Sequence, residues 1–281
     1  MLRLTGTGQH HTRTRPGPLR ASLAAVTSLL RGLLLLLGAT PRTPLRVLCI
    51  VALDTIHVCR HSRPIPRQTR KELAAFLDFQ ACTNAMWDGK RLVAADYQAL
   101  QQRLEKAGLE SWITEYLGRV RELETRRPLP GGDLRRFDEV RSYREAVARL
   151  SLATIAAIAL NAGCLDDAIE ATACDRDVAA LFRMAMQCQI IDDVIDYRED
   201  LSAGLPSFLT ASRSLPQAMT VTAEAARSYA ASPGSSAAGC LFPLQVALSV
   251  VTAATKLLVR VALRVVRYDR RGRRLDQLRD P

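Results

Sequence analysis

The chain has 281 residues, of which 48% are hydrophobic, 24% charged and 5% aromatic, with 15 glycines and 13 prolines. So few glycines and prolines exclude a loop-rich all-β protein or a disordered chain, and the length allows one large helical domain. The formal net charge of +11 suggests an anionic partner, and the position of the charge along the chain indicates which kind of anion that partner is.

Helical periodicity runs through nearly all of residues 44–267, and no alternating strand pattern of useful length occurs. It predicts helices, in chain order, at Pro44–Cys59, Thr69–Asp88, Ala94–Ala107, Leu109–Glu124, Asp133–Ala162, Asp175–Asp200, Leu215–Ala231 and Ala237–Val266. Proline and glycine turns separate them. We therefore expect one all-α bundle over residues 44–267, a loosely ordered or targeting-like basic segment over 1–43 and a basic tail over 268–281.

The positive charge lies at the two ends of the chain. Seven arginines precede the first acidic residue, Asp54, and eight arginines against three aspartates lie between Arg260 and the terminus, whereas residues 54–259 sum to −1. A nucleic-acid groove needs cations interleaved with aromatics on the folded body, so this distribution argues against nucleic-acid binding. Basic ends beside apolar residues suit the surface of an anionic membrane.

The longest apolar run, Ala237–Thr255, reaches the lower length limit of a membrane span. Pro243 and a helical periodicity that continues to Val266 favour a buried core helix instead. The seven cysteines form no CxxC pair and no zinc-type cluster, which is typical of a reducing compartment. We expect a cytoplasmic protein, with peripheral membrane association and a homodimer left open.

The most informative segment is the predicted helix that ends at Asp200. Asp192, Asp193, Asp196, Glu199, Asp200 and Gln189 fall within an arc of about 120° on that helix. A solvated face usually mixes charges of both signs, but this arc holds no Lys or Arg, and its carboxylates oppose the helix dipole. A bound divalent cation would relieve that cost. Mg²⁺ prefers such oxygen ligands, so Asp192, Asp196 and Asp200 are candidate metal ligands.

A second, weaker motif lies upstream. Asn84 and Asp88 are four residues apart, about 40° from each other at the end of another apolar helix. We expect this pair to face the acidic helix and to complete the metal site.

The residues Gln189–Asp200, followed by Gly204-Leu-Pro206, resemble the second aspartate-rich motif of squalene/phytoene synthase-like enzymes. Tyr143-Arg-Glu-Ala-Val-Ala148 is similar to the Y-x-x-x-V-A segment of that family, and Asn84-Ala-Met-Trp-Asp88 lies where the family carries its first D-x-x-x-D motif. The resemblance covers roughly residues 44–265.

The resemblance implies an isoprenoid-synthase fold and an enzyme in which Mg²⁺ ions grip an allylic prenyl diphosphate. Asp192, Asp196 and Asp200 would be metal ligands together with Asn84 and Asp88. Gln189 and Arg144 would lie beside the diphosphate, as would Arg198. Departure of the diphosphate would leave an allylic cation in an apolar cavity, where Trp87, Tyr143 or Phe182 would stabilise it.

Two departures from the family pattern bear on the reaction. Asn84 replaces the usual acid, and Arg149 stands where a glycine usually follows the Val-Ala pair. Both disfavour head-to-head condensation of two substrates, which remains the alternative, and are better tolerated by a single-substrate cyclase or a divergent prenyl transferase. We expect cyclisation of a substrate of fifteen to twenty carbons. Asp192-Asp193-Val-Ile-Asp196 also reads as the DDxxD of chain-elongating synthases, but no upstream DDxxD is present. A non-catalytic, membrane-peripheral helical partner protein is the alternative from another class.

Overall fold

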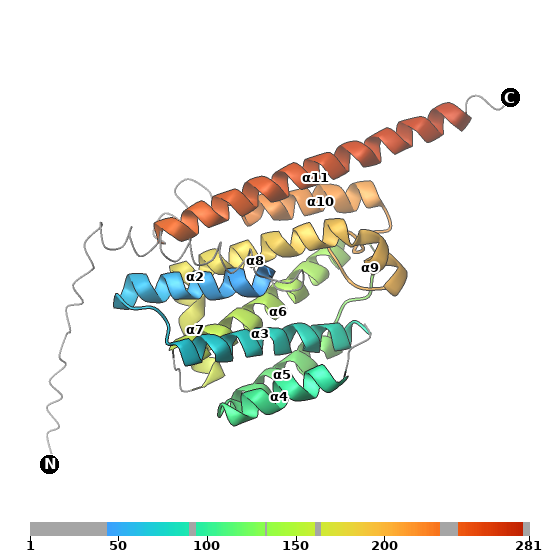
Figure 1. Cartoon of the computed structure of the whole chain (residues 1–281). Helices are drawn as coiled ribbons and strands as arrows, with labels where there is room; N and C mark the ends of the chain where they lie inside the picture. Colours follow the sequence, from blue (N-terminus) through green and yellow to red (C-terminus); the bar gives the residue numbers. More distant parts are fainter. Residues whose placement is uncertain (1–43, 90–93, 133, 161–163, 231–240, 278–281) are drawn as a thin grey trace, which may run out of the picture.

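The computed structural model describes residues 44–89, 94–132, 134–160, 164–230 and 241–277. All regular structure in these ranges is helical, which confirms the all-α, single-domain prediction (Figure 1). The helices are α2 (Pro44–His61), α3 (Arg67–Trp87), α4 (Ala94–Lys106), α5 (Glu110–Thr125), α6 (Leu134–Leu160), α7 (Leu165–Cys174), α8 (Arg176–Ile195), α9 (Tyr197–Ala203), α10 (Leu215–Ser228) and α11 (Phe242–Gln277). The targeting-like segment predicted for residues 1–43 lies outside the described ranges.

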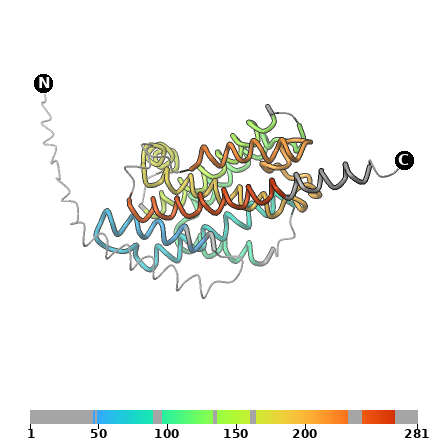
Figure 2. The backbone as a smooth tube through the Cα atoms, turned by 90° about the horizontal axis from the view of Figure 1, so that it is seen from above, coloured from blue at the N-terminus to red at the C-terminus, as the bar shows by residue number. Residues whose placement is uncertain are grey.

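Helix α8 lies at the centre of the bundle. It packs against α2, α6, α7, α10 and α11, with α10 and α11 along one edge of the molecule and α4 and α5 along the opposite edge (Figure 1). Figure 2, seen from above, shows α11 running lengthwise over the bundle. The helix begins where the Asp175 carboxylate accepts hydrogen bonds from the amides of Asp177 and Val178, at 2.9 and 3.2 Å. Such a cap satisfies amides that have no partner within the helix. Residues on almost every side of α8 are buried, as its apolar first half predicts.

The predicted single helix Asp175–Asp200 is in fact two helices. Asp196 separates α8 from α9 with φ −92° and ψ 9°, values outside the regular α-helix. The sequence around Asp196 contains no glycine or proline, so the residues that usually end a helix do not predict this bend. The break falls inside the carboxylate cluster, where like charges four residues apart disfavour a continuous helix.

A glycine turn brings the chain back over the end of α8. Gly204 has φ 66°, a left-handed conformation that closes α9, and the amide of Leu205 reaches back to the carbonyl of Asp200 at 2.9 Å. The next residues are buried, and the amide of Ser207 donates to the Thr210 hydroxyl at 2.7 Å. The 206–211 loop is thereby fixed beside the acidic end of α8.

Two further helices differ from the prediction. Helix α7 begins at Leu165, with Cys164 as its N-cap, in a stretch where no helix was predicted. Helix α11 continues to Gln277, eleven residues beyond the predicted end. The prediction that α11 is a buried core helix holds for one face of the helix only. Leu244, Leu248 and Val259 are buried, but the stretch Phe242–Arg264 is long and apolar enough to cross a membrane and only 22% buried in its most apolar window.

Candidate functional site

Residues from distant parts of the chain meet in one polar pocket of about 90 Å³ at the acidic end of α8. The pocket collects eight of the site residues predicted from the sequence: Asn84, Asp88, Tyr143, Arg144, Gln189, Asp192, Asp196 and Asp200. Leu205 and Pro206 close one side, because the Gly204 turn folds the chain back at this point. The two acidic motifs therefore face each other, as the sequence predicted.

An apolar cavity of about 530 Å³ adjoins the polar pocket. Asn84, Val147, Gln189 and Asp192 line both, so the two spaces meet at these residues. Helices α2, α3, α6 and α8 form the cavity wall with small and aliphatic side chains, among them Leu77, Leu152, Ile155 and Ala185. This volume lies within the range of about 300–1,000 Å³ that is typical of small-molecule binding sites.

The first motif is tied to two residues that the sequence did not single out. The Arg127 guanidinium donates to Asp88 at 2.6 Å and to Glu124 at 3.2 Å, and the Tyr143 hydroxyl donates to Glu124 at 2.6 Å. Burial and the bond to Glu124 raise the pKa of Tyr143, so its phenol stays protonated. Glu124 lies in the last turn of α5 and Arg127 just beyond its end, and nothing in their spacing links them to Asp88 or Tyr143.

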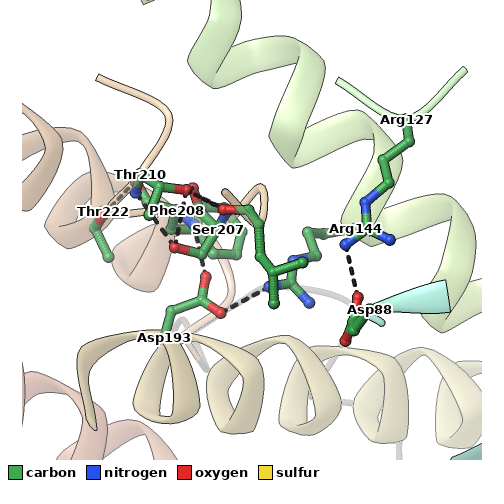
Figure 3. A network of polar contacts seen from close by, with 9 residues as sticks. Asp88, Arg127, Arg144, Asp193, Ser207, Phe208, Thr210 and Thr222 are labelled. Atoms are coloured by element: carbon green, nitrogen blue, oxygen red, sulfur yellow. Dashed lines mark hydrogen bonds and ion pairs between the residues drawn. The ribbon is translucent and has the colours of Figure 1, made fainter. Parts of the chain in front are cut away.

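Asp193 has a different role from its acidic neighbours. Its side chain is almost completely buried, accepting a hydrogen bond from Arg144 at 2.9 Å and one from the amide of Phe208 at 2.6 Å (Figure 3). Desolvation raises the pKa of Asp193 to about 6, although Arg144 and the Phe208 amide both oppose the shift. Asp193 thus holds the 206–211 loop and orients Arg144, which was predicted only as a diphosphate contact.

The remaining polar groups are directed to the pocket. Asp192 is exposed, Asp196 is half-buried and Asp200 is buried. The Gln189 side-chain oxygen and the Arg144 Nε are both buried and have no hydrogen-bond partner. Buried polar atoms are nearly always satisfied in folded proteins, so these two atoms mark a place where a polar ligand is expected.

The donor set suits a metal that shares its coordination with a ligand. Within the described residues, no three His, Cys, Asp or Glu side chains converge closely enough to hold an ion by themselves. Mg²⁺, however, usually keeps waters and bridges one or two carboxylates to substrate phosphates. The oxygen donors of Asp192, Asp196 and Gln189 fit that second arrangement. They do not form a preformed all-protein cage.

Some predicted contacts are not made. Trp87 and Phe182 line neither space, and no aromatic ring is among the described residues that line the apolar cavity. Phe182 instead packs under the Arg149 guanidinium at 4.0 Å from its ring centre. Arg198 is exposed and also outside the pocket; even on a straight helix it would lie about 120° from Asp192, off the acidic arc.

Arg149 also lies outside both spaces.

Comparison with known proteins identifies no relative: no protein-family model, curated protein or solved structure matches the chain.

Proposed function

We propose that the protein is a Mg²⁺-dependent class I isoprenoid synthase that ionises an allylic prenyl diphosphate. The observation that carries this proposal is the junction of the two spaces: opposed acidic motifs line a polar pocket that opens into an apolar cavity. A prenyl diphosphate has the same division, with a highly charged head and a hydrocarbon tail. The resemblance of Gln189–Asp200 to the second motif of squalene/phytoene synthase-like enzymes points to the same substrate.

Different polar residues of the pocket would bind the metal ions and the diphosphate. Asp192, Asp196 and Asp200, with Asn84 and Asp88 opposite, would hold Mg²⁺, which supplies positive charge to the departing diphosphate. Arg144 lies in the pocket and is fixed by Asp193, so it presents a cation without a large loss of side-chain entropy. Tyr143 keeps its proton and holds Glu124, which with Asp88 positions Arg127.

The apolar cavity would receive the hydrocarbon and exclude water from the cation. One such cavity joins the polar pocket, and a single hydrocarbon site would suit a single-substrate reaction, cyclisation, better than condensation of two prenyl chains. Because no described aromatic ring lines the wall, the cation would lie against aliphatic side chains and polar groups such as those of Gln80 and Ser151. We therefore expect fewer rearrangements than an aromatic-lined site supports.

The test is turnover of purified protein with Mg²⁺ and prenyl diphosphates of ten to twenty carbons, monitored as released pyrophosphate and as hydrocarbon product. We expect activity with the fifteen- or twenty-carbon substrate, reduced at least about a hundredfold in Asp192→Ala and Asp196→Ala, as for loss of a charge-stabilising group. Glu199→Ala is the matched control, because this exposed carboxylate lies outside the pocket. Activity that is equal in all three variants would contradict the proposal.

A non-catalytic helical partner protein is the second candidate. The observation that favours it is the ion pair between Asp88 and Arg127, which engages an acid of the first motif. Absence of turnover with every substrate, together with no thermal stabilisation by Mg²⁺ and pyrophosphate, would support this candidate over the enzyme.

A further inference from the structure

Helix α11 has an outward apolar face that no described part of the chain covers. Its large apolar side chains are exposed by 74% at Phe242, 44% at Val246, 62% at Val250, 65% at Leu257 and 48% at Val261. At about 100° per residue, all five fall within an arc of about 100°. They form one stripe that runs for roughly 28 Å at 1.5 Å per residue. A contiguous apolar surface of this kind marks an interaction site.

The inward face of the same helix is also largely apolar. Leu244, Leu248 and Val259 are buried against the bundle together with Thr252 and Thr255, and the Thr255 hydroxyl donates to the carbonyl of Val251 at 2.9 Å. A surface helix of a water-soluble protein normally turns polar side chains toward solvent, whereas the stripe turns large apolar ones outward. The outward face is therefore suited to an apolar environment.

The charges beside the stripe indicate which apolar environment it meets. Residues 242–264 contain no acidic residue, and their three cations, Lys256, Arg260 and Arg264, are all exposed. Lys256 lies beside the stripe at about −80° from Val246, Arg260 lies on its edge at about −40°, the angle of Phe242, and Arg264 follows the stripe at its C-terminal end. Long cationic side chains place their stems in an apolar layer and their charges at its border. This combination matches the interface of an anionic bilayer.

We propose that the outward face of α11 docks the protein on an anionic lipid bilayer, with the stripe in the acyl border and Lys256, Arg260 and Arg264 among the headgroups. The helix lies on the membrane and does not cross it, because its inward side stays packed on α8 and α10. This docking is independent of the proposed enzymatic activity. It would hold the protein at the phase in which hydrocarbon substrates and products dissolve.

The test compares binding of the full chain to vesicles of phosphatidylcholine alone and of phosphatidylcholine with one-third phosphatidylglycerol, by flotation. Leu257→Glu should lower the partition coefficient on the mixed vesicles at least about tenfold, since one buried leucine contributes about that factor. Leu129→Glu is the matched control, because this leucine is 73% exposed on the loop after α5 and its loss should leave binding unchanged. Leu257→Phe should bind as the wild type does.

Three results would overturn the proposal. The first is wild-type protein that does not float with the mixed vesicles. The second is Leu257→Glu that binds as tightly as Leu129→Glu, which would assign the binding to another part of the chain. The third is a dimer that Leu257→Glu converts to a monomer, by light scattering, without a change in vesicle binding; the face would then be covered by a second copy. Circular dichroism confirms that each variant is folded.

Discussion

Replacing Asp193 by alanine should destabilise the fold, whereas replacing its neighbour Asp192 should not. Loss of the Asp193 carboxylate leaves the buried amide of Phe208 without an acceptor and removes the charged partner of Arg144. An orphaned buried amide costs about 1–3 kcal/mol, and a lost hydrogen bond to a charged group costs about 1.5–3 kcal/mol. The desolvation penalty that raises the pKa of Asp193 is relieved at the same time, so we expect a net loss of about 2–4 kcal/mol.

Urea unfolding followed by circular dichroism measures this difference directly. Asp193→Asn keeps an acceptor for the Phe208 amide and should lose only about half as much as Asp193→Ala. Asp192→Ala, at an exposed position, should stay within about 0.5 kcal/mol of the wild type. Equal stability of Asp193→Ala and the wild type, or equal losses at both positions, would refute the assignment of Asp193 as the residue that holds the 206–211 loop.

Two other substitutions test the scaffold and the cavity. Asp175→Ala removes the cap of α8 and the bidentate pair with Arg60, at 2.7 and 2.8 Å, and should cost about 2–4 kcal/mol at pH 7. Burial alone would raise the pKa of Asp175, but the Arg60 bonds and the α8 amides outweigh it and lower the pKa. The stability difference should therefore be complete above the unfolded pKa, near 4, and shrink as the pH falls through the lowered value. Urea titrations at pH 7 and pH 3 show this, and an unchanged difference would contradict the ion-pair account. Ala185→Phe fills part of the apolar cavity and should lower kcat/KM for the twenty-carbon substrate more than for the ten-carbon one. Equal effects on both would mean that the hydrocarbon does not occupy this cavity.

The fold class and the main helices follow from the sequence because periodicity and turn chemistry act locally. The meeting of Asn84 and Asp88 with the acidic end of α8 was also predicted, because oxygen ligands from a second helix were expected to complete the metal site. The bend at Asp196 was not predictable, because no glycine or proline marks it. The sequence placed Asp192, Asp196 and Asp200 on one straight helix, whereas the structure divides them between two.

The roles of Asp193, Arg127 and Glu124 depend on contacts between distant segments. Asp193 falls on the same predicted arc as Asp192, and only its bonds to Arg144 and Phe208 reveal its structural role. Arg127 and Glu124 reach the first motif because α5 ends beside Asp88. Hydrophobic periodicity shows which face of a helix is buried, but it does not show which neighbour that face meets.

The most direct test of the central claim compares pyrophosphate release from an allylic prenyl diphosphate and from its saturated analogue of equal length, each with Mg²⁺. Ionisation to an allylic cation requires the double bond beside the departing group, whereas hydrolysis at phosphorus does not. We predict release from the allylic substrate only, with a hydrocarbon or terpene alcohol as the second product and with loss of both in Asp192→Ala. Equal release from both substrates, or none from either, would contradict the assignment of this pocket as an isoprenoid synthase site.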